Sequence, residues 1–296
     1  MMLKRGKIKE NLIEGLFFIN GLIVVIILIG IFILLLKNAL PGLKEVGVFH
    51  FLTTGYWNPD AYDQATYGAL AMLMSTLMVT LGSLVIAVPL GIGTAAYLSD
   101  VASPKVREIA KPVIEILAGI PSVVLGFLGI VLLGPFLAKV TGTYNGLNAI
   151  NGAILLAVMA LPTIISLSED ALNSVPRSYS EASLGLGANK WQTVTLVKVP
   201  AAASGIVAAC MLGMGRAIGE TMTVLMATGN AAEFPTGFLS SVKTMTSTVA
   251  IELGEVAYFT THFYMLFAVG LILFIITFII NLISDIIFHK HMKMLK

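Results

Sequence analysis

Six long stretches of apolar residues, almost free of charge, constrain this chain more than any other feature. A helix needs about 20 apolar residues to cross a bilayer core of roughly 30 Å. The composition agrees, because 57% of the 296 residues are hydrophobic, 11% are charged, and the mean hydropathy is +0.93. No stretch alternates with the two-residue period of a lipid-facing barrel strand. We therefore expect an all-α membrane protein with six transmembrane helices, over residues 16–36, 70–98, 116–138, 152–168, 201–229 and 263–284.

The Lys and Arg residues between these stretches predict the orientation. Thirteen of them fall in segments on one side of the predicted spans and four on the other. Because positively charged loops stay in the cytoplasm, both termini are expected there, as an even number of spans requires. The first stretch is too long for a signal peptide, so we expect it to be retained. The thirteen residues are Lys4, Arg5, Lys7, Lys9, Lys105, Arg107, Lys111, Arg177, Lys190, Lys198, Lys290, Lys293 and Lys296.

The longest predicted cytoplasmic segment, the loop 169–200, has the pattern of a helix, a turn and a second helix. Pro176 suits the first turn of a helix, and Gly187 suits its end, because glycine adopts a left-handed conformation at little cost. A second amphipathic run, 191–199, leads toward the fifth span. An interfacial helix that only anchors the loop is one interpretation. The small residues on the predicted helical face favour docking into a groove on another protein. That face carries Tyr179, Ala182, Ser183 and Leu186.

The same loop resembles the EAA loop of ABC importer permeases. The family pattern is E-A-A, three residues, G, nine residues, I, any residue, L, P. This chain has Glu181, Ala182 and Ser183, then Gly187, then Val197, Lys198, Val199 and Pro200. The resemblance implies a type I ABC importer permease fold (MetI-like), with a coupling helix that sits in a cleft of a cytoplasmic ATPase. No G-x-x-x-x-G-K-[ST] nucleotide motif occurs in the sequence, so we expect a transport subunit, not an enzyme, with ATP hydrolysis on a partner.

The segment 213–230, GMGRAIGETMTVLMATGN, resembles the fifth span of PstC-type permease subunits of phosphate importers. The segments 57–59 and 115–124 are similar to the same subunits. The resemblance implies a cytoplasmic membrane location in a prokaryote and inorganic phosphate as cargo. It also implies a PstA-type second permease, two PstB-type ATPase subunits and an extracytoplasmic PstS-type phosphate-binding protein as partners. Another oxyanion, sulfate or molybdate, stays open as the cargo.

Two charged residues in the predicted fifth span, Arg216 and Glu220, need a reason to lie at bilayer depth, because a charge there costs at least about 2.5 to 3.5 kcal/mol. One reason is structural, since residues four apart on a helix can pair. The other is transport. The Arg216 guanidinium matches phosphate oxygens, Glu220 can hold it while the site is empty, and Thr221 and Thr223 can add hydroxyl donors. A self-sufficient secondary transporter using Arg216 and Glu220 as a proton relay is the alternative from another class.

Glu115 lies near the cytoplasmic start of the predicted third span, where both an ion pair with Lys111 and a pathway role stay open. The glycines at 205, 213, 215 and 219 predict close helix packing. The four histidines show no metal-ligand spacing, and no cofactor is expected. The predicted organisation is an N-terminal segment with the first helix and outside loop, a five-helix permease domain and a basic tail, over residues 1–68, 69–289 and 290–296.

Overall fold

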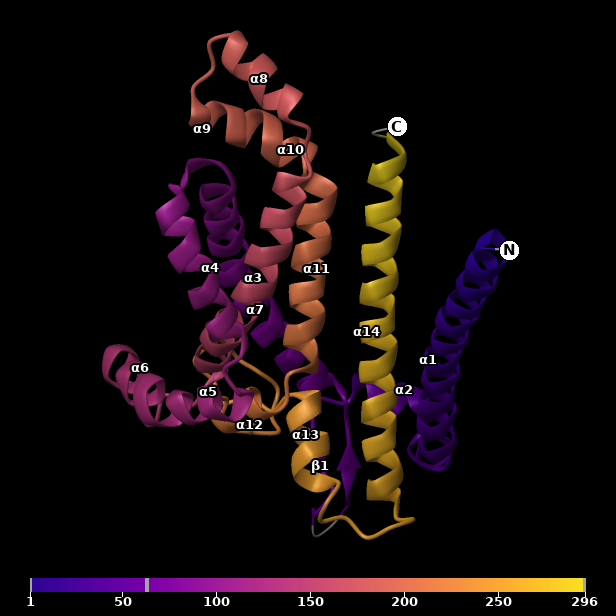
Figure 1. The fold of residues 1–296 in the computed structure, drawn as a ribbon. Coiled ribbons are helices and arrows are strands. Elements are labelled where there is room, and N and C mark those ends of the chain that lie inside the picture. Colours follow the sequence, from indigo (N-terminus) through magenta and orange to yellow (C-terminus); the bar gives the residue numbers. More distant parts are fainter. Residues whose placement is uncertain (1, 62–63, 295–296) are drawn as a thin grey trace.

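The long helices run alongside one another in a computed structural model that describes residues 2–61 and 64–294 (Figure 1). By length and composition, five helices of the described residues are fit to cross a membrane, or six if one bent pair counts as a span. Both termini and helix α8 (Arg177–Gly185) lie toward the same end of the molecule (Figure 1). The expected helical fold is confirmed. The longest helices are α1 (Met2–Val46), α3 (Leu70–Ala96), α7 (Ala149–Asn173), α11 (Ala203–Gly219) and α14 (Thr261–Met294).

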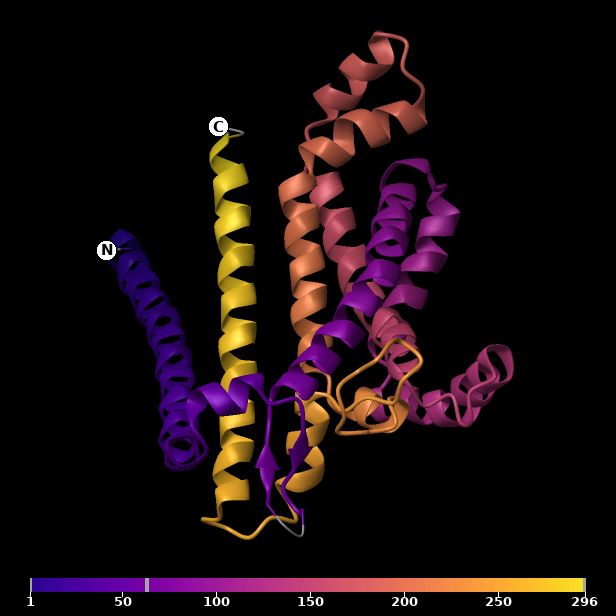
Figure 2. The same cartoon turned by 180° about the vertical axis from the view of Figure 1, so that it is seen from behind.

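The predicted third helix is not continuous. Helix α4 (Pro104–Ala118) ends at Gly119, and the chain resumes as α5, a π-helical segment η2 and α6. Pro121 has extended backbone angles, φ −61° and ψ 137°, and a proline has no N–H to continue the helical hydrogen bonds. Figures 1 and 2 both show α6 turned across the direction of the long helices. The bounds are Ser122–Leu128 for α5, Gly129–Leu133 for η2 and Gly134–Thr141 for α6.

The predicted fifth helix, 201–229, is broken as well. Helix α11 ends at Gly219, Glu220 is extended with φ −68° and ψ 132°, and α12 (Met222–Ala227) follows. At its other end, α11 meets the preceding helical segment, Lys190–Ala201, at an angle of 74°. The predicted fourth helix is too short, because α7 continues to Asn173 and includes residues assigned to the loop.

Small residues set the spacing between α11 and its neighbours. A Cβ atom on Gly205 would lie 2.5 Å from Ala171 Cβ, and one on Gly213 would lie 2.7 Å from Ile164 Cγ1, both on α7. A Cβ atom on Gly215 would instead approach Asn281 of α14, at 3.5 Å, and one on Gly219 would meet nothing within 4 Å. Close packing is therefore confirmed for the first two glycines against α7.

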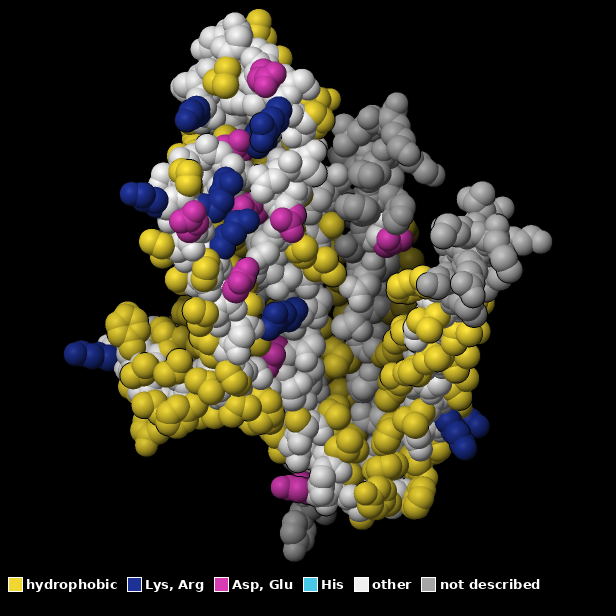
Figure 3. All heavy atoms as spheres, in the orientation of Figure 1, with side chains coloured by type: hydrophobic (Ala, Val, Ile, Leu, Met, Phe, Trp, Pro, Cys, Tyr) yellow, Lys and Arg dark blue, Asp and Glu magenta, His cyan; other side chains and the backbone are white. Residues whose placement is uncertain are grey.

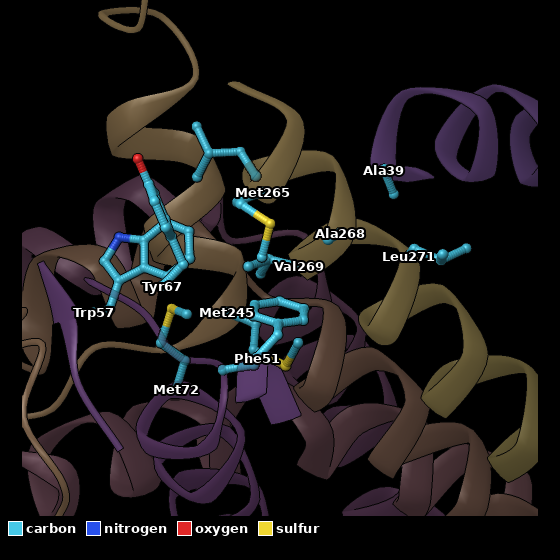
Figure 4. Packing of buried hydrophobic residues seen from close by; sticks show 12 residues of the cluster. Ala39, Phe51, Trp57, Tyr67, Met72, Met245, Met265, Ala268, Val269 and Leu271 are labelled. Atoms are coloured by element: carbon cyan, nitrogen blue, oxygen red, sulfur yellow. The ribbon is translucent and has the colours of Figure 1, made fainter. Parts of the chain in front are cut away.

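A compact cluster closes the end of the molecule opposite α8 (Figure 2). Short helix α2 (Val48–Thr53) leads into strand β1 (Trp57–Asn58), which pairs antiparallel with β2 (Thr66–Tyr67). Helix α13 (Met245–Glu252) packs beside them and against α14. Figure 4 shows the side chains that meet there, all buried, from α2, from the hairpin and from α1, α3, α13 and α14. They include Phe51, Trp57, Tyr67, Met72, Met245 and Met265.

Apolar and charged side chains separate on the surface. Figure 3 shows hydrophobic side chains covering α6 and the lower part of α1, while charged ones gather over α4 and the α8 end. Phe17 and Phe18 of α1 are each 70% exposed, and the most apolar window of this helix has no buried residue. Such a surface is stable only against lipid or another apolar protein surface. The chain is therefore a multi-pass membrane protein.

Candidate coupling loop and transport site

The loop after α7 forms a helix, a turn and a helix, as predicted. Helix α8 (Arg177–Gly185) begins directly after Pro176, and Gly187 has a φ of +88°, the left-handed conformation expected of it. Helix α9 (Lys190–Thr193) begins with a capping box, in which the Asn189 and Gln192 side chains each bind the other residue's backbone N–H. A π-helical segment, η3 (Val194–Lys198), and α10 (Val199–Ala201) complete the loop. We call residues 177–201 the docking unit.

A buried hydrogen bond holds the two helices of the docking unit together. The hydroxyl groups of Ser183 on α8 and Thr193 on α9 lie 3.0 Å apart, and both residues are buried. Glu181 and Ala182 of α8 are exposed, as is Pro200 in α10. The serine that replaces the second alanine of the family pattern therefore has a specific partner inside the unit.

An open groove with a mainly apolar lining runs along the docking unit. Its volume is about 540 Å³, and Leu186 at its edge is 90% exposed. Trp191 and Leu196 are also exposed, at 64% and 71%. Exposed apolar groups at this density mark an interaction surface, for another protein or for the membrane. The groove is lined by Ser178, Tyr179, Ala182, Ser183, Leu186, Ala188 and Val197.

The break after α11 separates the two charges that were predicted to pair. Arg216 is exposed in the last turn of α11, and among the described residues it has no carboxylate partner. The Glu220 carboxylate instead accepts a hydrogen bond from the backbone N–H of Thr223, at 3.2 Å, at the start of α12. The helical Arg216–Glu220 pair is wrong for this conformation, because the helix ends at Gly219 and Glu220 turns toward the next helix.

The threonines near the break differ in their surroundings. Thr223 is fully buried, and its hydroxyl donates to the carbonyl oxygen of Ser122 on α5, at 3.1 Å. Thr221 is partly exposed and donates to the Gly219 carbonyl, at 3.4 Å. Thr246 of α13 donates to the Glu220 carbonyl oxygen, at 2.8 Å. Around the break, Arg216 is therefore exposed and Glu220 and Thr221 are partly exposed, whereas the Thr223 hydroxyl lies inside the protein.

Glu115 lies on a second polar patch, between α4 and α7. Lys111, the predicted partner of Glu115, pairs instead with the buried Glu169 of α7, at 3.0 Å. The sequence interpretation missed this pair because Glu169 was assigned to a loop. Glu115 is exposed and lines, with Lys111, Glu169 and Asp170, a pocket of about 170 Å³.

A network of polar side chains at the opposite end was not predicted. The Glu252 carboxylate binds Lys243, His262 Nε2 at 2.7 Å and Trp57 Nε1 at 2.9 and 3.1 Å. Burial alone would raise the pKa of Glu252, but the hydrogen bonds from His262, Lys243 and Trp57 outweigh it and lower the pKa. The four residues come from the hairpin, α13, its preceding segment and α14, so the network ties these elements together.

Two of the predicted membrane helices are interrupted, and a helix-turn-helix is exposed at one end of the molecule. This arrangement is that of a permease of the binding-protein-dependent type. A family model described as binding-protein-dependent transport system inner membrane component matches residues 87–292. The chain belongs to this family of transport-system membrane subunits.

Several relatives are similar over most of the chain. A probable ABC transporter permease, YqgH of Bacillus subtilis, is 39% identical over 80% of this chain and 77% of its own. The phosphate transport system permease PstC of Mesorhizobium japonicum is 34% identical over 89% of this chain and 85% of its own. PstC of Haemophilus influenzae is 30% identical over 95% and 93%.

Solved structures share the fold at low sequence identity. A chain of the MetNI methionine ABC transporter, in an inward-facing conformation, superposes with a TM-score of 0.57 at 22% identity, over 76% of this chain and 94% of that one. A chain of a bacterial alginate ABC transporter superposes with a TM-score of 0.62 at 14% identity, over 91% and 92%. The type I ABC importer fold implied by the loop is confirmed.

Proposed function

We propose that this chain is a permease subunit that moves inorganic phosphate across the cytoplasmic membrane of a prokaryote. Both termini and the docking unit lie on the cytoplasmic side in this proposal. Two relatives named for phosphate transport, at 30% and 34% identity over most of the chain, support the choice of cargo. The partners we propose are a homologous PstA-type permease, two PstB-type ATPase subunits and a PstS-type binding protein.

The observation that carries this proposal is the docking unit. It lies at one end of the molecule, away from the ends of α1, α3 and α14 that meet at the other, and exposes an apolar groove (Figure 1). A helix laid into a groove of a partner buries such residues as anchors. Closure of two ATPase subunits would move the two docking units and open the site between the permeases first to one side and then to the other.

Arg216 is the residue we propose for the anion. Its guanidinium is charged at any biological pH and offers a planar set of donors that fits phosphate oxygens. An exposed arginine in an apolar helix must face water or protein, since lipid contact costs at least about 2.5 to 3.5 kcal/mol. A polar passage between this chain and the second permease meets that requirement. Glu220 and Thr221 would line the same passage.

Reconstitution tests the function directly. The chain is purified with its associated subunits in mild detergent and placed in vesicles with a phosphate-loaded binding protein. We expect uptake of radiolabelled phosphate that requires ATP and that excess sulfate or molybdate does not reduce. Uptake driven by a proton gradient with this chain alone would refute the proposal and favour a secondary transporter. Inhibition by sulfate equal to that by phosphate would refute the choice of cargo.

A single substitution tests the pathway role of Arg216. Arg216→Gln should lower phosphate uptake per assembled complex, because glutamine is polar but lacks the charge and the donor fork of arginine. Lys139→Gln, at an exposed position on α6, is the matched control and should transport normally. Loss of complex assembly in Arg216→Gln would mean that the residue is structural.

A further inference from the structure

One nearly buried ion pair joins the docking unit to a different part of the chain. Lys198, the last residue of η3, donates from Nζ to both carboxylate oxygens of Asp100, each at 2.7 Å. The side chains are 8% and 21% exposed. The two residues are 98 positions apart, so the pair is a tertiary contact and not a local one.

Both partners lie in π-helical turns. Asp100 belongs to η1 (Tyr97–Val101), which extends the end of α3, and Lys198 belongs to η3. Such turns are rare and occur often at functional sites, because the inserted residue changes the direction in which a side chain points. The structure therefore uses an irregular turn on each side of this contact.

The η1 turn is also attached to α4. Arg107 of α4 donates to the carbonyl oxygens of Leu98, at 2.9 Å from Nε, and of Ser99, at 2.6 Å. Apolar contacts surround the junction, where Val194 of η3 packs in a cluster with residues of α3, α7 and α11. The cluster contains Ala95, Ala96, Leu172, Val194, Ala202 and Ile206. The docking unit is covalently connected to α7 and α11, and it also contacts the end of α3 directly. Its link to α4 is indirect, because Arg107 of α4 binds the η1 turn that holds Asp100.

The choice of charges at this contact needs an explanation beyond stability. Apolar residues of similar volume often stabilise a buried site as well as an ion pair does. Apolar contact is non-directional, however, and lets two surfaces slide. A nearly buried lysine–carboxylate pair keeps the two turns together, because separating them would leave a buried charge without its partner.

We infer that Lys198 and Asp100 are positioning residues that transmit the displacement of the docking unit to α3 and α4. This inference depends on the proposed function, because it assumes that an ATPase moves the docking unit. In this account α4, which carries Lys111 and Glu115, moves together with the loop. Without the pair, the ATPase would still dock and hydrolyse ATP, but fewer cycles would rearrange the helices.

The test measures ATP hydrolysed per phosphate imported, using the complete transporter in vesicles. Asp100→Asn and Lys198→Met remove the pair, the double variant D100K/K198D restores it with exchanged charges, and Lys139→Met is the surface control. We expect the ATP-to-phosphate ratio of each single variant to rise about twofold to thirtyfold, the range expected when one residue of a coupling network is changed. The exchanged pair should recover part of the loss.

Three results would overturn the inference. An unchanged ratio in assembled single variants would show that the pair transmits nothing. Failure of both single variants to assemble, with the ratio unchanged in the exchanged pair, would mean that the contact serves folding alone. A rise in the ratio equal in Lys139→Met would show that the effect is not specific. The proposed function is tested separately, because it fails only if the unsubstituted transporter shows no ATP-dependent phosphate uptake.

Discussion

The turn at Gly187 gives a sharp test of the docking unit. Gly187 has a φ of +88°, and a Cβ atom built on it meets nothing within 4 Å. An added side chain therefore has space, and its only cost is the left-handed backbone, about 1–2 kcal/mol for an L-residue. A cost of that size lowers the ratio of the native turn to other turn conformations by about 5-fold to 30-fold, with 30-fold as the upper limit. Gly187→Ala should lower phosphate uptake within this limit, and Gly187→Val should lower it further.

Gly185 provides the matched control. It lies two residues earlier, at the end of α8, and a Cβ atom there also meets nothing within 4 Å, but its φ is not positive. Gly185→Ala adds the same atom without the backbone cost and favours helix. Uptake, ATP hydrolysis and membrane content are measured for both variants in vesicles and cells. Equal uptake by Gly187→Ala and Gly185→Ala, with equal membrane content, would refute the reasoning.

Three further perturbations have defined outcomes. Gly213→Val should lower the melting temperature of the purified chain by several degrees, because its Cβ would lie 2.7 Å from a side chain of α7. Gly219→Val has open space around its Cβ and should not lower it. Melting curves in detergent compare the two variants. Ser183→Ala should destabilise the docking unit by about 1 kcal/mol, seen as faster amide hydrogen exchange in α8. Glu252 has a pKa lowered from 4.5, so its stabilising contribution is present above about pH 4.5 and is lost as the pH falls through the folded pKa. The melting temperature of the wild type should therefore fall more on acidification than that of Glu252→Gln.

The docking unit was predictable because its signals are local. Pro176 and Gly187 mark helix ends by their own backbone preferences, and both act within a few residues of where they stand. The number of long apolar stretches can likewise be counted directly along the sequence. Neither feature needs knowledge of distant contacts.

The interrupted helices show where such reasoning ends. Residues 201–229 are apolar enough for one helix, yet the chain breaks at Glu220. Its carbonyl accepts from Thr246, and its carboxylate accepts from the Thr223 N–H in the first turn of α12. Those bonds replace the helical ones, and one of them comes from 26 residues away. The break at Pro121 was signalled by proline, but the direction of α6 was not. Neither the break at Glu220 nor the direction of α6 can be derived from the order of residues along the chain.

The missed ion pairs have the same cause. Lys111 was expected to pair with Glu115, four residues further along the same helix, but the fold brings Glu169 closer. Lys198 was noted as a charge of the cytoplasmic side and as the variable position of the loop pattern, but its partner, Asp100, was not predicted. A lysine amid apolar residues indicates that a partner exists but not which one. The fold decides among carboxylates that lie far away along the chain.

The 74° bend at Ala202 makes the segment Lys190–Ala201 a lever set across the axis of α11. Twelve helical residues at 1.5 Å each give an arm of roughly 18 Å. A rotation of about 10° around Ala202 would then move the far end by about 3 Å. A small closing movement of the proposed ATPase subunits on this segment would therefore be enough to turn the core helices, without any of them unwinding.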